Sequence, residues 1–157
     1  MENTEQESIK VIMFNLGNEV YGVPIDQVLS IEHLEPITRV PNAAHFVEGV
    51  MNLRGLIIPV IDVRKRFGLA PVAATKDTRV IVVETDDLQV GMLVDTAKEV
   101  TDINVDSIEK TPEIIGGLDA GYINGVAKLG KESLMILLNL DRVLSDQDLD
   151  NLKLIEE

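Results

Sequence analysis

The segment Val11–Val28 reads VIMFNLGNEVYGVPIDQV and contains two apolar runs separated by Gly17-Asn18. Apolar and β-branched runs on either side of a turn-forming pair predict a β-hairpin. A second segment, Val80–Ala97 (VIVVETDDLQVGMLVDTA), aligns with the first without gaps at an offset of 69 residues. Four positions are identical in the alignment, namely Val11/Val80, Ile12/Ile81, Gly22/Gly91 and Asp26/Asp95. The chain therefore contains a duplicated hairpin.

The repeat continues beyond the two hairpins. Gly49-Val50 matches Gly125-Val126, and IPVIDVRKRF (Ile58–Phe67) matches MILLNLDRVL (Met135–Leu144) after one inserted residue. Each of these regions predicts two more strands joined by a tight turn. An isolated hairpin is only marginally stable, whereas about five strands can curl into a small filled barrel. We therefore expect an all-β fold of two related barrel lobes, approximately 8–75 and 76–145, that pack tightly or exchange strands.

Helical structure is expected to be short and local. The segments PIDQVLSI and DTAKEV, which follow the two hairpins, are long enough for one or two helical turns each. Leu140, Val143 and Leu144 share one face of a predicted C-terminal helix over residues 139–155. Proline and glycine residues predict two irregular connections, at 70–77 and 108–121.

Composition excludes several classes of function. The 157-residue chain contains no cysteine, which excludes disulfides, thiolate zinc sites and cysteine nucleophiles. Its net charge of −13 repels phosphate backbones, so nucleic acid is not an expected partner, and the basic run Arg64–Arg66 is expected to be solvated. Residues 1–7 lack the features of a signal peptide and are expected to form a disordered tail. No apolar run could insert into a membrane, so we expect a cytoplasmic protein, monomeric when free.

Two stretches imitate ligand motifs without completing them. Gly125–Lys131 (GVAKLGK) has the spacing of a phosphate-binding loop, but Glu132 stands where a magnesium-binding Ser or Thr is needed. Four acidic residues near the C-terminus match positions of a calcium loop that lacks its glycine, namely Asp146, Asp148, Asp150 and Glu157. We therefore expect no catalytic residues, cofactor or metal. A small acidic β-barrel that binds a ligand or acts as a hydrolase is the alternative, and a deep polar pocket with perturbed titrating groups would favour it.

The turn Asn52-Leu53-Arg54-Gly55 is unusual because it places a long cationic side chain at the tip of a predicted hairpin in an acidic protein. Gly55 can supply a positive φ and Asn52 can hydrogen-bond to the backbone, so both residues have a structural explanation. Arg54 is not required by the turn. It either forms an ion pair within the protein or anchors a partner, since arginine is enriched at interface hot spots.

From this turn outward, the sequence strongly resembles the CheW family of bacterial chemotaxis coupling proteins. The resemblance is carried by VPNAAHFVEGVMNLRGLIIPVIDVRKRFG (Val40–Gly68), and it extends to EVYGVPIDQV, VGMLVD and MILLNLDRVL elsewhere in the chain. It implies one domain over 8–157, with two SH3-like five-stranded β-barrels. It also implies a non-enzymatic adaptor that binds the cytoplasmic tips of transmembrane chemoreceptors and the C-terminal regulatory domain of the chemotaxis histidine kinase CheA.

The resemblance also implies which residues contact the receptor. The matching positions are Val28, Ser30, Gly49 and Arg54, together with the other members of the Asn-Leu-Arg-Gly turn, Asn52, Leu53 and Gly55. The family often has Glu at the position of Ser30, and Glu32, two positions further on, is the alternative carrier of that acidic contact. The kinase contact is expected on the second lobe, without named residues.

Overall fold

The computed structural model describes most of the chain. Six segments are described, namely 7–85, 88–109, 114–115, 118–119, 122–130 and 133–144. The expected disordered tail, apart from Glu7, lies outside these residues. So do the calcium-loop-like carboxylates and the predicted C-terminal helix beyond Leu144. Among the described residues, no helix is long and apolar enough to cross a membrane.

Two six-stranded sheets contain most of the strands in the described residues. Sheet A has the order β10-β13-β14-β2-β1-β9. Its strands are β1 (Ser8–Leu16), β2 (Glu19–Pro24), β9 (Thr96–Asn104), β10 (Ile108–Glu109), β13 (Ile123–Lys128) and β14 (Leu134–Leu138). Sheet B has the order β3-β7-β8-β6-β5-β4. Its strands are β3 (Val28–His33), β4 (Ile37–Thr38), β5 (Val47–Leu53), β6 (Leu56–Asp62), β7 (Arg79–Thr85) and β8 (Leu88–Val94).

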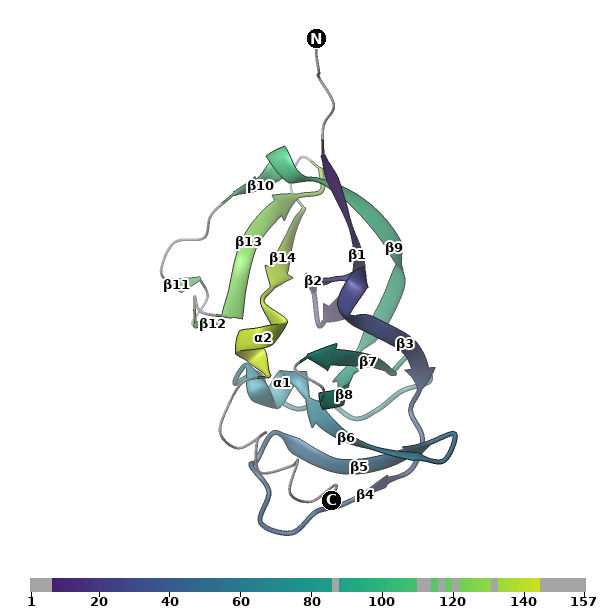
Figure 1. Cartoon of the computed structure of the whole chain (residues 1–157). Helices are drawn as coiled ribbons and strands as arrows, with labels where there is room; N and C mark the ends of the chain where they lie inside the picture. The colour runs from purple at the N-terminus through teal and green to yellow at the C-terminus, as the bar shows by residue number, and fades with distance from the viewer. Residues whose placement is uncertain are drawn as a thin grey trace.

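The two sheets exchange hairpins (Figure 1). The N-terminal hairpin β1–β2 lies in sheet A beside strands from the C-terminal half, and β7–β8 lies in sheet B between strands from the N-terminal half. The join is a short parallel pairing in each case, of β2 with β14 and of β8 with β6. Each sequence half thus completes the sheet of the other.

Strand registers confirm the repeat. Gly22 pairs with Leu137 in sheet A, and the repeat-equivalent Gly91 pairs with Val60 in sheet B. The antiparallel hairpins match as well, since bulges follow Val47 in β5 and Ile123 in β13, which are equivalent positions. The fold is therefore two SH3-like β-barrel subdomains, A and B, related by an internal repeat. Each sheet has six strands rather than the expected five, because the two-residue strands β4 and β10 add an edge to each.

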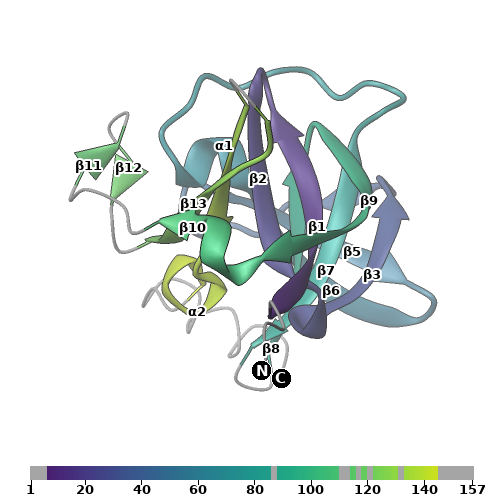
Figure 2. The same cartoon turned by 90° about the horizontal axis from the view of Figure 1, so that it is seen from above.

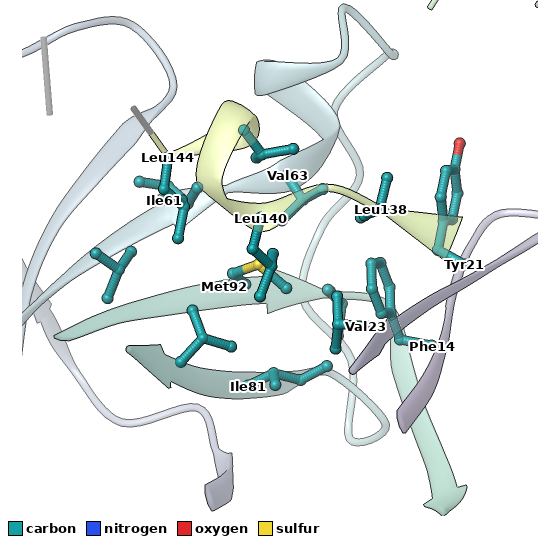
Figure 3. Close-up of a cluster of buried hydrophobic side chains, with 14 of the residues drawn as sticks. Phe14, Tyr21, Val23, Ile61, Val63, Ile81, Met92, Leu138, Leu140 and Leu144 are labelled. Atoms are coloured by element: carbon teal, nitrogen blue, oxygen red, sulfur yellow. The ribbon is translucent and has the colours of Figure 1, made fainter. Parts of the chain in front are cut away.

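Three buried clusters hold the fold together. Subdomain A encloses Val11, Ala127, Met135 and Leu137, and subdomain B encloses the repeat-equivalent residues Val80, Met51, Ile58 and Val60. The largest cluster lies between the subdomains and includes residues from both sequence halves (Figure 3). Its labelled members include Phe14, Tyr21, Ile61, Ile81, Met92, Leu138 and Leu140. We call this cluster the junction core, and burial of its apolar area holds the two barrels together.

Helical structure is sparser than expected. One 3₁₀ turn, Ile25–Gln27, follows the first hairpin, and the chain then enters β3. The prediction of a helix at DTAKEV was wrong, because Thr96 to Val100 of this stretch form the start of β9 and pair with β1. Two short helices, α1 (Val63–Arg66) and α2 (Leu140–Val143), follow β6 and β14. The second expected loop includes β10 and a two-residue strand pair, β11 (Ile114–Ile115) and β12 (Leu118–Asp119).

The basic run on α1 is not simply solvated, as had been expected. Arg64 forms an ion pair with Asp95, and Lys65 forms one with Glu48. The Arg66 guanidinium lies against two aromatic rings. The three basic side chains of α1 thus contact three different parts of the fold.

Candidate functional site

The tip of the β5–β6 hairpin projects Arg54 away from sheet B. Leu53 pairs with Leu56, so Arg54 and Gly55 form a two-residue turn. Both have positive φ, 49° and 91°, the combination typical of a type I′ turn. Asn52 stabilises the turn, because its Oδ1 accepts a hydrogen bond of 2.9 Å from the amide of Gly55. Arg54 is not a glycine, so it occupies this left-handed backbone position at some conformational cost.

The Arg54 guanidinium contacts Glu32 on β3 through both carboxylate oxygens. Nη2 lies 2.8 Å from Oε2 and Nη1 lies 3.4 Å from Oε1. The Arg54 side chain is nevertheless 70% exposed, whereas that of Glu32 is 17% exposed. The hydrogen bond from Arg54, followed by one from the Ser30 side chain, lowers the pKa of Glu32. Three of the predicted site residues, Ser30, Glu32 and Arg54, therefore interact through the Glu32 carboxylate.

Strand β3 and the β5–β6 hairpin meet at this ion pair. β3 is an edge strand of sheet B, since β7 is its one neighbour among the described strands. Figures 1 and 2 show the tip of the β5–β6 hairpin lying beside the end of β3. The ion pair thus links the edge strand to a hairpin that is not its neighbour in the sheet order. We call Ser30, Glu32 and Arg54 the edge triad.

Exposed apolar side chains gather on the same two elements. Of the nine large apolar residues exposed in the described part of the chain, four lie on β3 or at the start of β6, and each is at least 39% exposed. They are Leu29, Ile31, Leu56 and Ile57. Such a combination of apolar groups and a cation at one edge is typical of a protein-contact surface. Sequence reasoning missed Leu29 and Ile31 because it assigned PIDQVLSI to helical turns rather than to a strand.

The remaining predicted site residues have other positions. Val28 begins β3 and packs partly buried against the junction core, at a bulge before Ser30. Gly49 is buried in β5, and a Cβ there would collide with the backbone carbonyl of Thr38. Leu53 packs against the core of subdomain B. Gly49 and Leu53, like Asn52 and Gly55 in the turn, shape the hairpin that carries Arg54.

A separate cavity of about 650 Å³ lies beside the 39–48 segment and Lys65. Lys65 Nζ contacts Glu48 Oε1 at 2.8 Å, and this hydrogen bond raises the pKa of Lys65. A raised pKa keeps the amine protonated, which is the opposite of what a nucleophile or general base needs. Lys65, which lines the cavity, is therefore held in its protonated form. Within the described ranges, no group of three His, Asp or Glu side chains is arranged to hold a metal ion.

Comparisons with known proteins agree on one family. A family model described as "CheW-like domain" matches residues 10–148. The chain is 36% identical to "Chemotaxis protein CheW" of Klebsiella aerogenes over 138 residues, covering 88% of this chain and 82% of that protein. It is 32% identical to the protein of the same name in Thermotoga maritima over 151 residues, covering 96% of this chain and 90% of that one.

A solved structure has the same fold. It is the crystal structure of the scaffolding protein TtCheW from Thermoanaerobacter tengcongensis, with a TM-score of 0.82 and 35% sequence identity. The similarity covers 90% of this chain and 96% of that one. The fold of this chain is therefore similar to that of a protein described as a scaffold.

Proposed function

Because the chain belongs to the CheW-like family, we propose that it is a chemotaxis adaptor that couples transmembrane chemoreceptors to the histidine kinase CheA by binding both. It acts in the cytoplasm as a non-enzymatic scaffold, and residues 8–157 form its one functional domain. The observation that carries the proposal is the edge triad, in which Glu32 on the edge strand β3 holds a solvent-facing Arg54.

The edge triad supports binding to a receptor tip. Arg54 has five N–H donors, and its ion pair with Glu32 uses two of them, so donors remain for a partner. Glu32 holds the guanidinium in one orientation, which lowers the entropy lost when a partner binds. Leu29 and Ile31 alternate with Ser30 and Glu32 along β3, so they add exposed apolar area on the other face of the same edge strand. The proposed receptor contact is therefore a modest, partly apolar surface centred on β3 and the hairpin tip.

Coupling requires two contact surfaces on one body. The proposed receptor surface lies on subdomain B, and we place the kinase contact on the second lobe, residues 76–145, which supplies four of the six strands of sheet A. A scaffold of this kind needs no chemistry, since holding two partners together raises the effective concentration of one near the other. We infer that the free protein is a monomer, because its charge of −13 opposes self-association.

Arg54→Ala is expected to weaken binding of receptor cytoplasmic fragments about five- to thirtyfold, the loss typical of an interface anchor. Thermal stability should change little, because Arg54 is largely exposed. Calorimetric titration of the full chain with a receptor fragment measures the first effect, and a thermal melt measures the second.

Lys10→Ala is the matched control for Arg54→Ala. Lys10 forms an exposed ion pair of 2.9 Å with Asp102 in sheet A, so its removal changes the net charge equally without touching the edge triad. Glu32→Gln tests the orienting role, and it should weaken binding less than Arg54→Ala does. Equal affinities of the Arg54→Ala and Lys10→Ala variants would remove Arg54 from the receptor contact.

The coupling itself is tested with receptor-containing membranes and the kinase. In the presence of the protein, kinase should co-sediment with the membranes and its activity should depend on the receptors. Kinase that neither co-sediments nor changes activity when the protein is added would contradict the adaptor function.

A further inference from the structure

Arg66 lies at the point where the two repeats face each other. It ends α1, and the repeat aligns it with Val143, which ends α2. Phe46 and Tyr122 are likewise equivalent, and their carbonyls accept equivalent hydrogen bonds: Asp62 N donates to Phe46 O at 2.7 Å and Asn139 N to Tyr122 O at 2.8 Å. These two bonds show that the surroundings of α1 and α2 are equivalent in the two repeats.

The Arg66 guanidinium contacts both Phe46 and its equivalent Tyr122, and it also contacts Val143, the equivalent of Arg66 itself. Arg66 Cζ lies 4.6 Å from the ring centroid of Phe46 and 5.1 Å from that of Tyr122. Its Nε donates a hydrogen bond of 3.1 Å to Val143 O, a carbonyl at the end of α2 that has no partner within its own helix. A planar cation can contact two rings and donate in its own plane, which a lysine ammonium does less well.

The rings around Arg66 continue through the junction. Tyr122 stacks with Phe67 at 5.8 Å, Phe67 contacts Tyr21 at 5.7 Å, and Tyr21 stacks with Phe14 at 5.5 Å between centroids. With Phe46, these are all five aromatic residues of the chain. The whole aromatic content therefore lies in one continuous array between the subdomains, with Arg66 at one end. Aromatic pairs of this kind favour defined geometries over free sliding.

We propose that Arg66 is a positioning residue that fixes the angle between subdomains A and B. The equivalent position 143 is a valine, which has no guanidinium. Arg66 is therefore the one member of this pair that can make cationic contacts to both repeats. The apolar junction core supplies attraction but little direction, whereas the Arg66 contacts are directional. Resting on the proposed function, the consequence is that Arg66 sets how the receptor surface on subdomain B is placed relative to the kinase surface on the second lobe.

The test replaces Arg66 with methionine in the full chain, which keeps length but removes the cation and the donor. Residual dipolar couplings measured by NMR report the orientation of each sheet. The couplings are fitted to the relative orientation that the two sheets have in the unchanged protein. One alignment tensor should then describe both sheets of the unchanged protein, whereas Arg66→Met should need a separate tensor for each sheet. The amide of Asn139, next to the broken contact, should exchange with solvent at least tenfold faster. Arg66→Lys, measured if Arg66→Met does not fold, should show the same changes to a smaller degree.

Arg79→Met is the control, because Arg79 donates only short-range bonds to Lys76 O and Thr78 O within the described residues, each of 2.9 Å. A single tensor for Arg66→Met, or for Arg66→Lys where that is the folded variant, would overturn the proposal. These measurements are made on the free protein, so their outcome does not depend on the adaptor function. In the coupled assay, the variant should keep its affinities for receptor fragment and kinase within twofold but lose most kinase control. Intact control with altered orientation would overturn the functional consequence.

Discussion

Gly49→Ala is expected to destabilise the protein by about 3–5 kcal/mol, the sum of a strained backbone and an overpacked contact. Gly49 lies at the β5 bulge with a φ of +145°, a conformation that side chains rarely adopt. An added Cβ would collide with the carbonyl of Thr38 on β4, which is backbone and cannot rotate away. Relief would require separating β4 from β5, which pair at Thr38 and Val50.

Urea unfolding at constant pH measures this loss. Gly55→Ala is the control, because Gly55 also has a positive φ but no atom lies within 4 Å of an added Cβ. It should cost about 1–2 kcal/mol from backbone strain alone. If Gly49→Ala cost no more than Gly55→Ala, the close approach of β4 would not matter. The expected result also means that lost receptor binding in a Gly49 variant would reflect a damaged barrel rather than a missing contact.

Asp95→Asn is expected to lower the free energy of unfolding by about 2–4 kcal/mol, because it leaves a largely buried cation without its partner. Arg64 contacts Asp95 through Nε at 3.0 Å and Nη2 at 2.6 Å, and the two side chains are 14% and 24% exposed. Asp95 also accepts a hydrogen bond of 2.7 Å from the amide of Gly17 in the first hairpin turn. The pair therefore ties α1, the end of β8 and the β1–β2 turn together.

The same pair predicts a pH dependence. The hydrogen bond from Arg64, with a further one from the Gly17 amide, lowers the pKa of Asp95 in the folded protein. A lowered folded-state pKa contributes stability above the unfolded value, about pH 4, and that contribution is lost as the pH falls through the folded value. The stability difference between the unchanged protein and Asp95→Asn should therefore be largest near pH 7 and shrink below about pH 4.

Chemical unfolding of both proteins between pH 7 and pH 3 measures that difference. Asp102→Asn is the matched control, since it breaks the exposed Lys10–Asp102 pair and should have little effect at any pH. A difference for Asp95→Asn that stays constant across the range would show that the carboxylate charge is not what stabilises the junction.

The strands of the fold were predicted well from the sequence, because the repeat gives two equivalent segments that support each strand assignment. The hairpins at β1–β2 and β7–β8 were expected from alternation and turns, and the equivalent registers confirm them. The error at DTAKEV has a physical cause: six residues carry too little periodicity to distinguish a helical turn from a strand. Pairing of Thr96–Val100 with β1 decides the matter, and that partner lies more than eighty residues away in sequence.

The candidate site likewise has features that local sequence predicts and contacts that only the folded chain makes. The Asn-Leu-Arg-Gly motif located the turn and identified Arg54 as its unexplained residue, because turn chemistry is local and depends on adjacent residues. Its partner Glu32 lies on a strand at the opposite side of the sheet order, so only the closing of the barrel brings the two together. Arg66 is the clearest example, since the basic run Arg64–Arg66 was expected to be solvated and its contacts were not predicted. Sequence by itself determined the repeat, the turns and the family, which follow from local patterns. The tertiary structure alone decided which charges meet, because contacts between distant segments depend on how two curled sheets pack.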